Sequence, residues 1–226
     1  MKLNWAERWA VNNPLRVIQQ KWEIRWFWRK SSLPPGAAIL EIGCGRGAGA
    51  RILYRTFQPR TFHASDLDLH MIRKAEEYLL PEDRKPIRFL TADVLNLPYG
   101  KNSFDAVFGF GVLHHVPDWQ SALCEISRVL KPGGFYFLEE LYPGLYQNFI
   151  TKHILLHPRE NRFRSHDLKQ EFQERKLQWR DCLELRMLGV LAIAVKAPCQ
   201  QEAKDRAKKK GRAISGSAFP HSSQLL

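Results

Sequence analysis

The sequence contains little cysteine and no long hydrophobic run. Its four cysteines, Cys44, Cys124, Cys182 and Cys199, are far apart and form neither a Cys-x-x-Cys pair nor a Cys/His cluster. This scatter excludes a disulfide-rich mini-protein and a zinc ribbon, and it favours a reducing, cytoplasmic compartment. The longest apolar run, residues 188–195, is too short to cross a bilayer. The first nine residues include an acid and two tryptophans where a secretory signal needs an apolar stretch. We therefore expect a soluble or peripheral protein.

Acidic residues are outnumbered in this chain. It carries 35 Lys and Arg against 23 Asp and Glu, a formal charge of +12. Acidic partners such as nucleic acid or an anionic membrane therefore have to be considered. Residues 200–226 hold six basic and two acidic side chains, hence +4, and the rest of the chain keeps +8. Charge alone does not choose between the two kinds of partner.

The length and the hydrophobic content of 44% suit one globular domain with short extensions. We expect an N-terminal helical extension over residues 1–32, a domain over 33–197, and a basic tail over 198–226. The tail is rich in Lys, Arg, Ser and Gly, a composition that predicts disorder.

Between residues 37 and 140, short apolar runs alternate with helical patterns. This alternation is typical of βαβ units and of a parallel sheet covered on both faces. Helices are predicted over Met71–Leu80 and Trp119–Leu130. The predicted strands are Ala37–Ile42, Thr61–Ser65, Ile87–Leu90, Ala106–Phe110 and Phe135–Leu138.

The pattern changes after the fifth strand. Aromatic and basic residues fill Tyr142–Arg164, and Ser165–Lys176 reads as a helix. Two apolar runs, Trp179–Arg186 and Met187–Lys196, follow with almost no linker and predict an antiparallel pair at the edge of the sheet. We therefore expect an α/β fold: a doubly wound, mainly parallel, seven-stranded sheet with helices on both faces.

The N-terminal extension contains a basic, tryptophan-rich amphipathic helix. Leu15, Ile18, Trp22 and Trp26 recur at helical spacing, with Lys and Arg between and beside them. Such a stripe can pack over the parent domain as a lid that shapes a pocket and keeps it dry. It can also lie at a membrane interface, with Lys and Arg facing anionic lipid. Packing is the interpretation that we favour, because amphipathic stripes usually bury on their own protein.

A glycine-rich segment, residues 41–47 (EIGCGRG), stands where the first strand should run into the first helix. Glycines there permit a tight turn and a close approach of backbone N–H groups to a ligand. Asp66 follows Gly47 by nineteen positions and is placed to accept both ribose hydroxyls of an adenine nucleoside. Arg46 inside the loop points either to solvent or to an anionic group. The loop also satisfies G-x-G-x-x-A, so a nicotinamide- or flavin-binding domain stays open at this point.

Downstream motifs separate these alternatives. Residues 91–94 (TADV) end the third strand, 103–107 (SFDAV) enter the fourth, 111–118 (GVLHHVPD) follow it, and 130–134 (LKPGG) precede the fifth. In this order the set resembles the class I S-adenosylmethionine-dependent methyltransferases over about residues 33–196. The resemblance is to the branch that contains quinone C-methyltransferases and many small-molecule methyltransferases. It implies a Rossmann-like methyltransferase fold and S-adenosyl-L-methionine as the cofactor.

The resemblance assigns parts of the cofactor to parts of the chain. It gives the methionine part to the glycine loop, the ribose to the acid after the second strand, and the adenine to the acid after the third. It also implies that residues at the end of the fourth strand line the floor of the site near the methyl group. The cofactor-binding residues so implied are Glu41, Gly43, Gly45, Gly47, Asp66, Leu67, Asp93, Val94 and Phe110.

Methyl transfer requires an aligned nucleophile and exclusion of water, and a strong base is optional. His114 and His115 are the candidate catalytic residues, since imidazole titrates near neutral pH, although packing at a helix start is the simpler role for each. No metal-ligand cluster is evident. Residues 108–111 (FGFG) replace the Asn/Asp-Pro-Pro-Tyr motif with which related enzymes hold an amino group, which disfavours methylation of an amino base.

The sequence thus predicts transfer of a methyl group to a small, hydrophobic or lipid-like acceptor. Peripheral contact with an anionic membrane is a second expected interaction, nucleic acid is a weaker one, and the oligomeric state is not indicated. An RNA or protein methyltransferase is the alternative within the class. A nicotinamide-dependent oxidoreductase or a non-catalytic cofactor-binding protein is the alternative outside it.

Overall fold

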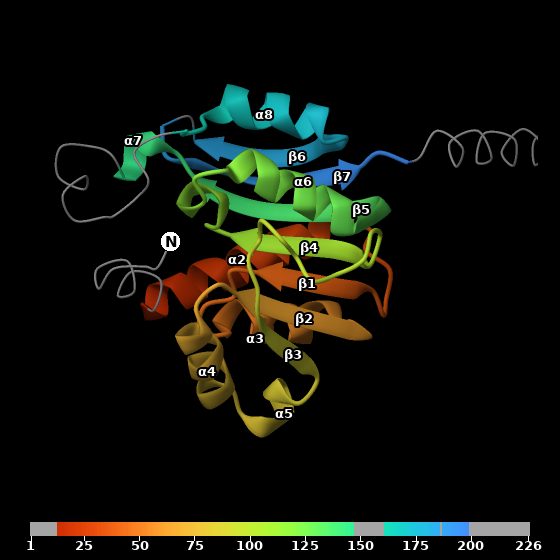
Figure 1. Cartoon of the computed structure of the whole chain (residues 1–226). Helices are drawn as coiled ribbons and strands as arrows, with labels where there is room; N and C mark the ends of the chain where they lie inside the picture. The colour runs from red at the N-terminus through yellow and green to blue at the C-terminus, as the bar shows by residue number, and fades with distance from the viewer. Residues whose placement is uncertain (1–12, 147–160, 186, 199–226) are drawn as a thin grey trace, which may run out of the picture.

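The computed structural model describes residues 13–146, 161–185 and 187–198. These residues form one seven-stranded sheet flanked by helices (Figure 1). The strands are β1 (Ala38–Ile42), β2 (Thr61–Asp66), β3 (Ile87–Thr91), β4 (Phe104–Phe110), β5 (Leu130–Leu141), β6 (Leu177–Leu185) and β7 (Gly189–Lys196). The predicted basic tail, and the aromatic segment after β5 from residue 147 to 160, lie outside the described residues.

The sheet order is β3-β2-β1-β4-β5-β7-β6, and all pairs are parallel except the two that β7 makes with β5 and β6. The predicted doubly wound sheet with one antiparallel strand is therefore confirmed. Because the order reverses between β1 and β4, the loops after these strands diverge and leave a crevice at their carboxyl ends. In such folds this crevice is where ligands bind.

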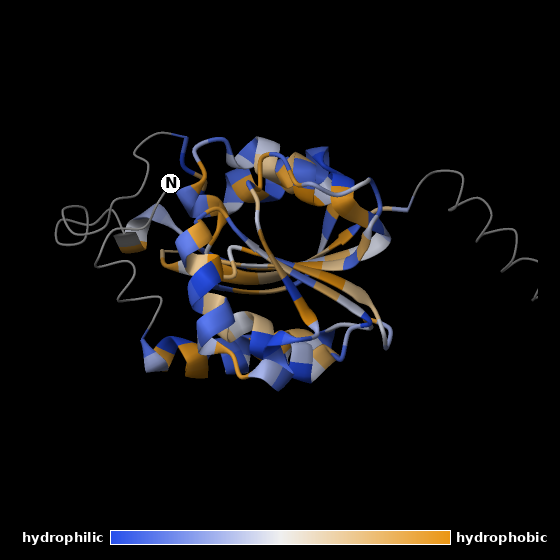
Figure 2. Ribbon diagram, turned by 60° about the horizontal axis from the view of Figure 1, so that its bottom comes forward, coloured by the Kyte–Doolittle hydropathy of each residue, from blue (hydrophilic) through white to orange (hydrophobic). Residues whose placement is uncertain are grey.

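Helices cover both faces of the sheet. They are α2 (Pro14–Lys30), α3 (Ala48–Phe57), α4 (Leu69–Tyr78), α5 (Pro81–Arg84), α6 (Trp119–Val129), α7 (Pro143–Tyr146) and α8 (Ser165–Glu174), with a 3-10 turn η1 (Leu113–His115). Successive residues of one strand point to opposite faces. Leu40 packs with α6 and α8, and Ile39 packs with α2 and α3. Figure 2 shows the hydrophobic strands between the two helical layers.

One prediction about the N-terminal helix is wrong. α2 does pack on its own domain, but mostly not through the predicted apolar stripe: Leu15, Ile18 and Trp22 are exposed, and only Trp26 of the stripe packs, partly buried, against the core. The helix instead buries Ile24 and Phe27 against the sheet. The physical reason is that the buried side also carries Arg16 and Glu23, and the second partner of Arg16, Glu139, lies on β5, so the pattern within the helix does not reveal which side faces the protein.

The start of β5 also differs from the prediction, which placed the strand over Phe135–Leu138 and ended the preceding helix at Leu130. The strand begins at Leu130, which pairs with Phe104 of β4. Gly133, with φ of +77°, carries the chain through the irregular register that follows. This pairing joins residues that are far apart in sequence, so local periodicity does not show it.

Candidate active site

The glycine loop after β1 is held in one conformation by its neighbours. Gly43 has φ of +65°, and a Cβ on it would lie 2.6 Å from Cγ2 of Val112. Gly45 has φ of +52° and open space where its Cβ would be. The N–H of Cys44 donates to the carbonyl of Ser65 at 2.9 Å, which fixes the loop to β2. The loop is therefore bare on one side and packed on the other.

Asp66, the last residue of β2, is bound to the same loop. Its Oδ2 accepts a hydrogen bond from the N–H of Gly45 and its Oδ1 accepts one from the N–H of Asp68, both at 2.9 Å. Burial raises the pKa of Asp66, although these N–H groups oppose the shift. The carboxylate is thus fixed in orientation beside the loop, with acceptor capacity left for a ligand.

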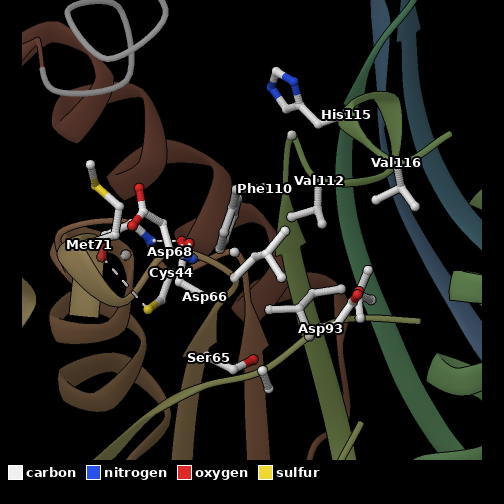
Figure 3. Close-up of a pocket in the computed structure, with 18 of the residues that line it drawn as sticks. Cys44, Ser65, Asp66, Asp68, Met71, Asp93, Phe110, Val112, His115 and Val116 are labelled. Atoms are coloured by element: carbon white, nitrogen blue, oxygen red, sulfur yellow. Dashed lines mark hydrogen bonds between the residues drawn. The ribbon is translucent and has the colours of Figure 1, made fainter. Parts of the chain in front are cut away.

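A cavity of about 250 Å³ opens at the carboxyl ends of the parallel strands (Figure 3). Residues that follow four strands contribute to its wall, among them Gly45, Asp66, Asp93, Val94, Phe110 and His115. Both polar groups and apolar side chains line it, a combination typical of small-molecule sites. The site therefore lies where the sheet order predicts a ligand.

Most of the predicted site residues meet at this cavity. Its wall contains Gly43, Gly45, Asp66, Leu67, Asp93, Val94, Phe110 and His115. Three predicted residues lie behind the wall: Glu41, Gly47 and His114. Gly47 is the N-cap of α3, and a Cβ on it would lie 3.1 Å from that of Ala75. The structure thus gives Gly47 a packing role, and its predicted contact with the cofactor stays a prediction.

Glu41 is a buried acid directly behind the wall. Its side chain abuts the backbone of Gly49, which lines the cavity. Burial and the nearby charge of Asp66 raise the pKa of Glu41 well above the usual value. Its Oε2 has no hydrogen-bond partner within the part of the chain that the structure describes. An unpaired buried carboxyl oxygen is costly, so this atom calls for a donor at the cavity wall.

The two histidines occupy different environments. His114 is fully buried, and its Nδ1 lies 2.8 Å from Oε2 of Glu140. Burial and the charges of Arg162 and Arg16 lower the pKa of His114 to about 3, so it is neutral at pH 7. His115 lines the cavity (Figure 3). Of the two predicted catalytic residues, His115 is the one that faces the site.

Glu140 organises the turn between β4 and α6. Its Oε1 accepts from the N–H groups of Val112 and Leu113 at 3.1 and 2.8 Å, and its Oε2 accepts from the N–H of His114 at 3.2 Å. Burial nevertheless raises the pKa of Glu140 to about 8. These bonds fix the loop that presents Val112 and His115 to the cavity.

The sequence predicted that this helix could shape a pocket, but it did not show which residues of α2 reach the site. Arg16 and Gln20 line the cavity. Arg16 forms ion pairs with Glu23 of its own helix, at 3.1 Å, and with Glu139 of β5, at 2.8 Å. The available signals were the spacing of Arg16 and Glu23 by two helical turns and an acid ending the apolar run of β5. These signals do not reveal that the three groups meet.

The described residues set two further limits on the site. Across residues 13–146, 161–185 and 187–198, no helix combines the length and apolar character needed to cross a membrane. Within the same ranges, no group of three or more His, Cys, Asp or Glu side chains is arranged to hold a metal ion. Arg46, which was predicted to face solvent or an anion, lies at the cavity wall with its guanidinium 4.8 Å from the ring centroid of Tyr78.

Comparison with known proteins agrees with this geometry. Residues 40–138 match the family described as "Methyltransferase domain". A fatty-acid O-methyltransferase of Mycolicibacterium smegmatis is 34% identical over 108 residues, which is 48% of this chain and 38% of that protein. A phthiotriol/phenolphthiotriol dimycocerosates methyltransferase of Mycobacterium tuberculosis is 35% identical over 110 residues, which is 48% of this chain and 39% of that protein. The chain thus spans about two-fifths of the length of these curated relatives.

The fold has counterparts among solved structures. A SAM-dependent methyltransferase from Aquifex aeolicus superposes with a TM-score of 0.69 at 16% identity, over 87% of this chain and 100% of that one. This likeness concerns the fold alone. Residues 40–138 thus match a methyltransferase family, and the sheet order and the superposition show the fold of such enzymes.

Proposed function

We propose that this protein transfers a methyl group from S-adenosylmethionine to a small, lipid-like acceptor. The observation that carries the proposal is the hydrogen bond between Asp66 and the bare glycine loop at the edge of the cavity. This arrangement places backbone N–H groups and a fixed carboxylate side by side. An adenosyl ligand with a charged amino-acid end requires both kinds of group.

The donor set fits that cofactor. We assign the ribose hydroxyls to Asp66 and the adenine to Asp93 with the backbone of Val94. The open space at Gly45 leaves room for the methionine part, and a contact of the cofactor with Glu41, which lies behind the wall, stays a prediction. When bound, S-adenosylmethionine supplies an electrophilic methyl group on a sulfonium. The remaining task of the chain is to align the acceptor and exclude water.

The acceptor side of the cavity combines apolar and basic groups. Val112 and Val116 contribute apolar surface, and His115 and Arg16 contribute nitrogen atoms. This lining favours a hydrophobic acceptor with one polar end. The M. smegmatis and M. tuberculosis relatives described above carry names that specify fatty acids and phthiotriol lipids. A lipid hydroxyl or carboxylate therefore agrees with both the cavity and the relatives, and the quinone branch expected from the sequence stays a prediction.

His115 is the residue that we assign to the proton of a hydroxyl acceptor. A neutral imidazole at the cavity wall can take that proton as the oxygen attacks the methyl carbon. A carboxylate acceptor needs no such step, because it is already ionised at neutral pH. The cysteines Cys44, Cys124 and Cys182 are free thiols, in keeping with the reducing, cytoplasmic compartment that we propose.

The experiment that tests this function is transfer of a labelled methyl group to fractionated cell extracts, followed by mass identification of the product. Label in the lipid fraction supports the proposal. Label in RNA or protein alone would move the acceptor to another class, and no label in any fraction would support a non-catalytic role. Asp66→Asn should abolish most of the incorporation, and Asp181→Asn is the matched control, because Asp181 pairs with Lys30 and is not part of the cavity wall.

A further inference from the structure

The way α2 packs leaves an unusual surface on its other side. The helix is fixed to the domain by Ile24 and Phe27, both fully buried, and by the ion pair of Arg16 with Glu139 of β5. These contacts all lie on one side of the helix. The opposite side is therefore held outward in a fixed orientation.

That outward side carries large apolar residues. Leu15, Ile18 and Trp22 are 70%, 63% and 57% exposed, and their spacing of three and four residues places them in one stripe. Figure 2 shows hydrophobic colour in the first turns of this helix. Single exposed apolar residues are ordinary, but an aligned stripe on a rigid helix marks an interaction surface.

The charges on this side have one sign. Lys21, Arg25 and Arg29 are exposed beside the stripe, and they make α2 cationic on its outward side. The only acid of the helix, Glu23, is buried on the inner side. An apolar stripe with tryptophan, bordered by Lys and Arg, matches the boundary between headgroups and acyl chains of an anionic membrane. An acidic protein surface would satisfy the cations but leave the stripe without a hydrophobic partner.

The surface is adjacent to the active site. Arg16 and Gln20 line the cavity, and they lie on the same helical turns as Leu15 and Ile18. Figure 1 shows the beginning of α2 at the edge of the sheet where the parallel strands end. A bilayer that contacts the outward side would therefore lie within a helix diameter of the cavity, about 10 Å.

We propose that the outward face of α2, formed by Leu15, Ile18, Trp22, Lys21, Arg25 and Arg29, docks onto an anionic lipid bilayer. The stripe enters the interface and the cations meet lipid phosphates. The binding itself requires neither the cofactor nor the acceptor, so it stands independently of the proposed methyl transfer. If both hold, docking brings the cavity to the surface from which a lipid acceptor is taken.

The test is co-sedimentation of the full chain with vesicles of phosphatidylglycerol or phosphatidylcholine, without cofactor or substrate. We expect binding to phosphatidylglycerol at low salt, weak binding to phosphatidylcholine, and release from phosphatidylglycerol at about 0.5 M salt, where charge attraction is screened. Trp22→Ala should weaken binding about tenfold, since it removes the largest apolar side chain of the stripe. The pair Arg25→Glu and Arg29→Glu should weaken it at least tenfold.

Leu80→Ala is the control, because Leu80 is 54% exposed but lies between α4 and α5, outside α2. It should leave binding within about twofold of the wild type, as judged by the same partition assay. Equal losses for Trp22→Ala and Leu80→Ala would overturn the proposal. So would an absence of wild-type binding to anionic vesicles, or binding that all these variants leave unchanged. Every variant keeps the basic tail, so binding through the tail alone would give this last result.

Discussion

Phe27 anchors α2, and its replacement by alanine tests how the helix is attached. The side chain is fully buried, and its ring lies 5.1 Å from that of Phe137 and 6.2 Å from those of Phe108 and Phe110, between ring centroids. Phe27→Ala removes all of these contacts and opens space between the helix and the sheet. The neighbouring Trp28 is exposed and serves as the control position.

The expected loss can be worked from this environment. Replacing a fully buried phenylalanine by alanine costs about 3–5 kcal/mol, since transfer and cavity contributions add. For a chain of this size each kcal/mol lowers Tm by about 2–4 °C, so Phe27→Ala should lower it by about 6–20 °C. Trp28→Ala should change the free energy of unfolding by less than about 0.5 kcal/mol.

Urea denaturation followed by circular dichroism measures both variants. Because α2 also contributes Arg16 and Gln20 to the cavity, Phe27→Ala should further weaken cofactor binding at a temperature where the domain stays folded. A Phe27→Ala protein that unfolds within 1 kcal/mol of the wild type, or that differs no more than Trp28→Ala does, would refute the attachment described here.

Three further predictions concern the site. Burial raises the pKa of Glu140 to about 8 from its usual 4.5, so the folded state holds a proton that the unfolded state releases. Below pH 6.5 the lowered pKa of His114 opposes this effect, so the free energy of unfolding should fall as pH rises from about 6.5 to 8, by up to about 1.4 kcal/mol per pH unit. Glu140→Gln should flatten this slope in urea titrations, and a stability that rises over this range contradicts it. His115→Ala should lower turnover of a hydroxyl acceptor at least about tenfold without changing Tm or cofactor affinity, and unchanged turnover removes His115 from the reaction. Gly43→Ala should destabilise more than Gly45→Ala in thermal melts, because only the first Cβ would meet Val112, and equal effects would leave the close packing unsupported.

The sheet could be predicted from the sequence because its signals are local. Buried parallel strands such as Ala38–Ile42, which is apolar except for Glu41, are recognisable as apolar runs, and glycines mark the turn that follows. Asp66 stands at the end of such a run, so its place beside the loop follows from the topology once the sheet is recognised. The same reasoning brings Asp93 and Phe110 to the same edge.

The parts that sequence reasoning missed depend on partners distant in the chain. The outward stripe on α2 was expected to be buried, because within the helix sequence it is the most apolar side. The inner side is decided by Glu139, which is 123 residues away from Arg16 and forms an ion pair with it. His114 and His115 are likewise adjacent in sequence, and both were candidate catalytic residues. Only the structure shows that His114 contacts Glu140 in the core.

The central claim is that the cavity beside Asp66 binds S-adenosylmethionine. Isothermal titration calorimetry of the full chain with S-adenosylmethionine, and separately with NAD, tests it most directly. The account predicts saturable binding of S-adenosylmethionine and no binding of NAD. For Asp66→Asn it predicts a Kd about ten- to a hundredfold higher, since the variant loses hydrogen bonds to a charged acceptor. Binding of NAD in place of S-adenosylmethionine, or an Asp66→Asn variant that binds as tightly as the wild type, would contradict it.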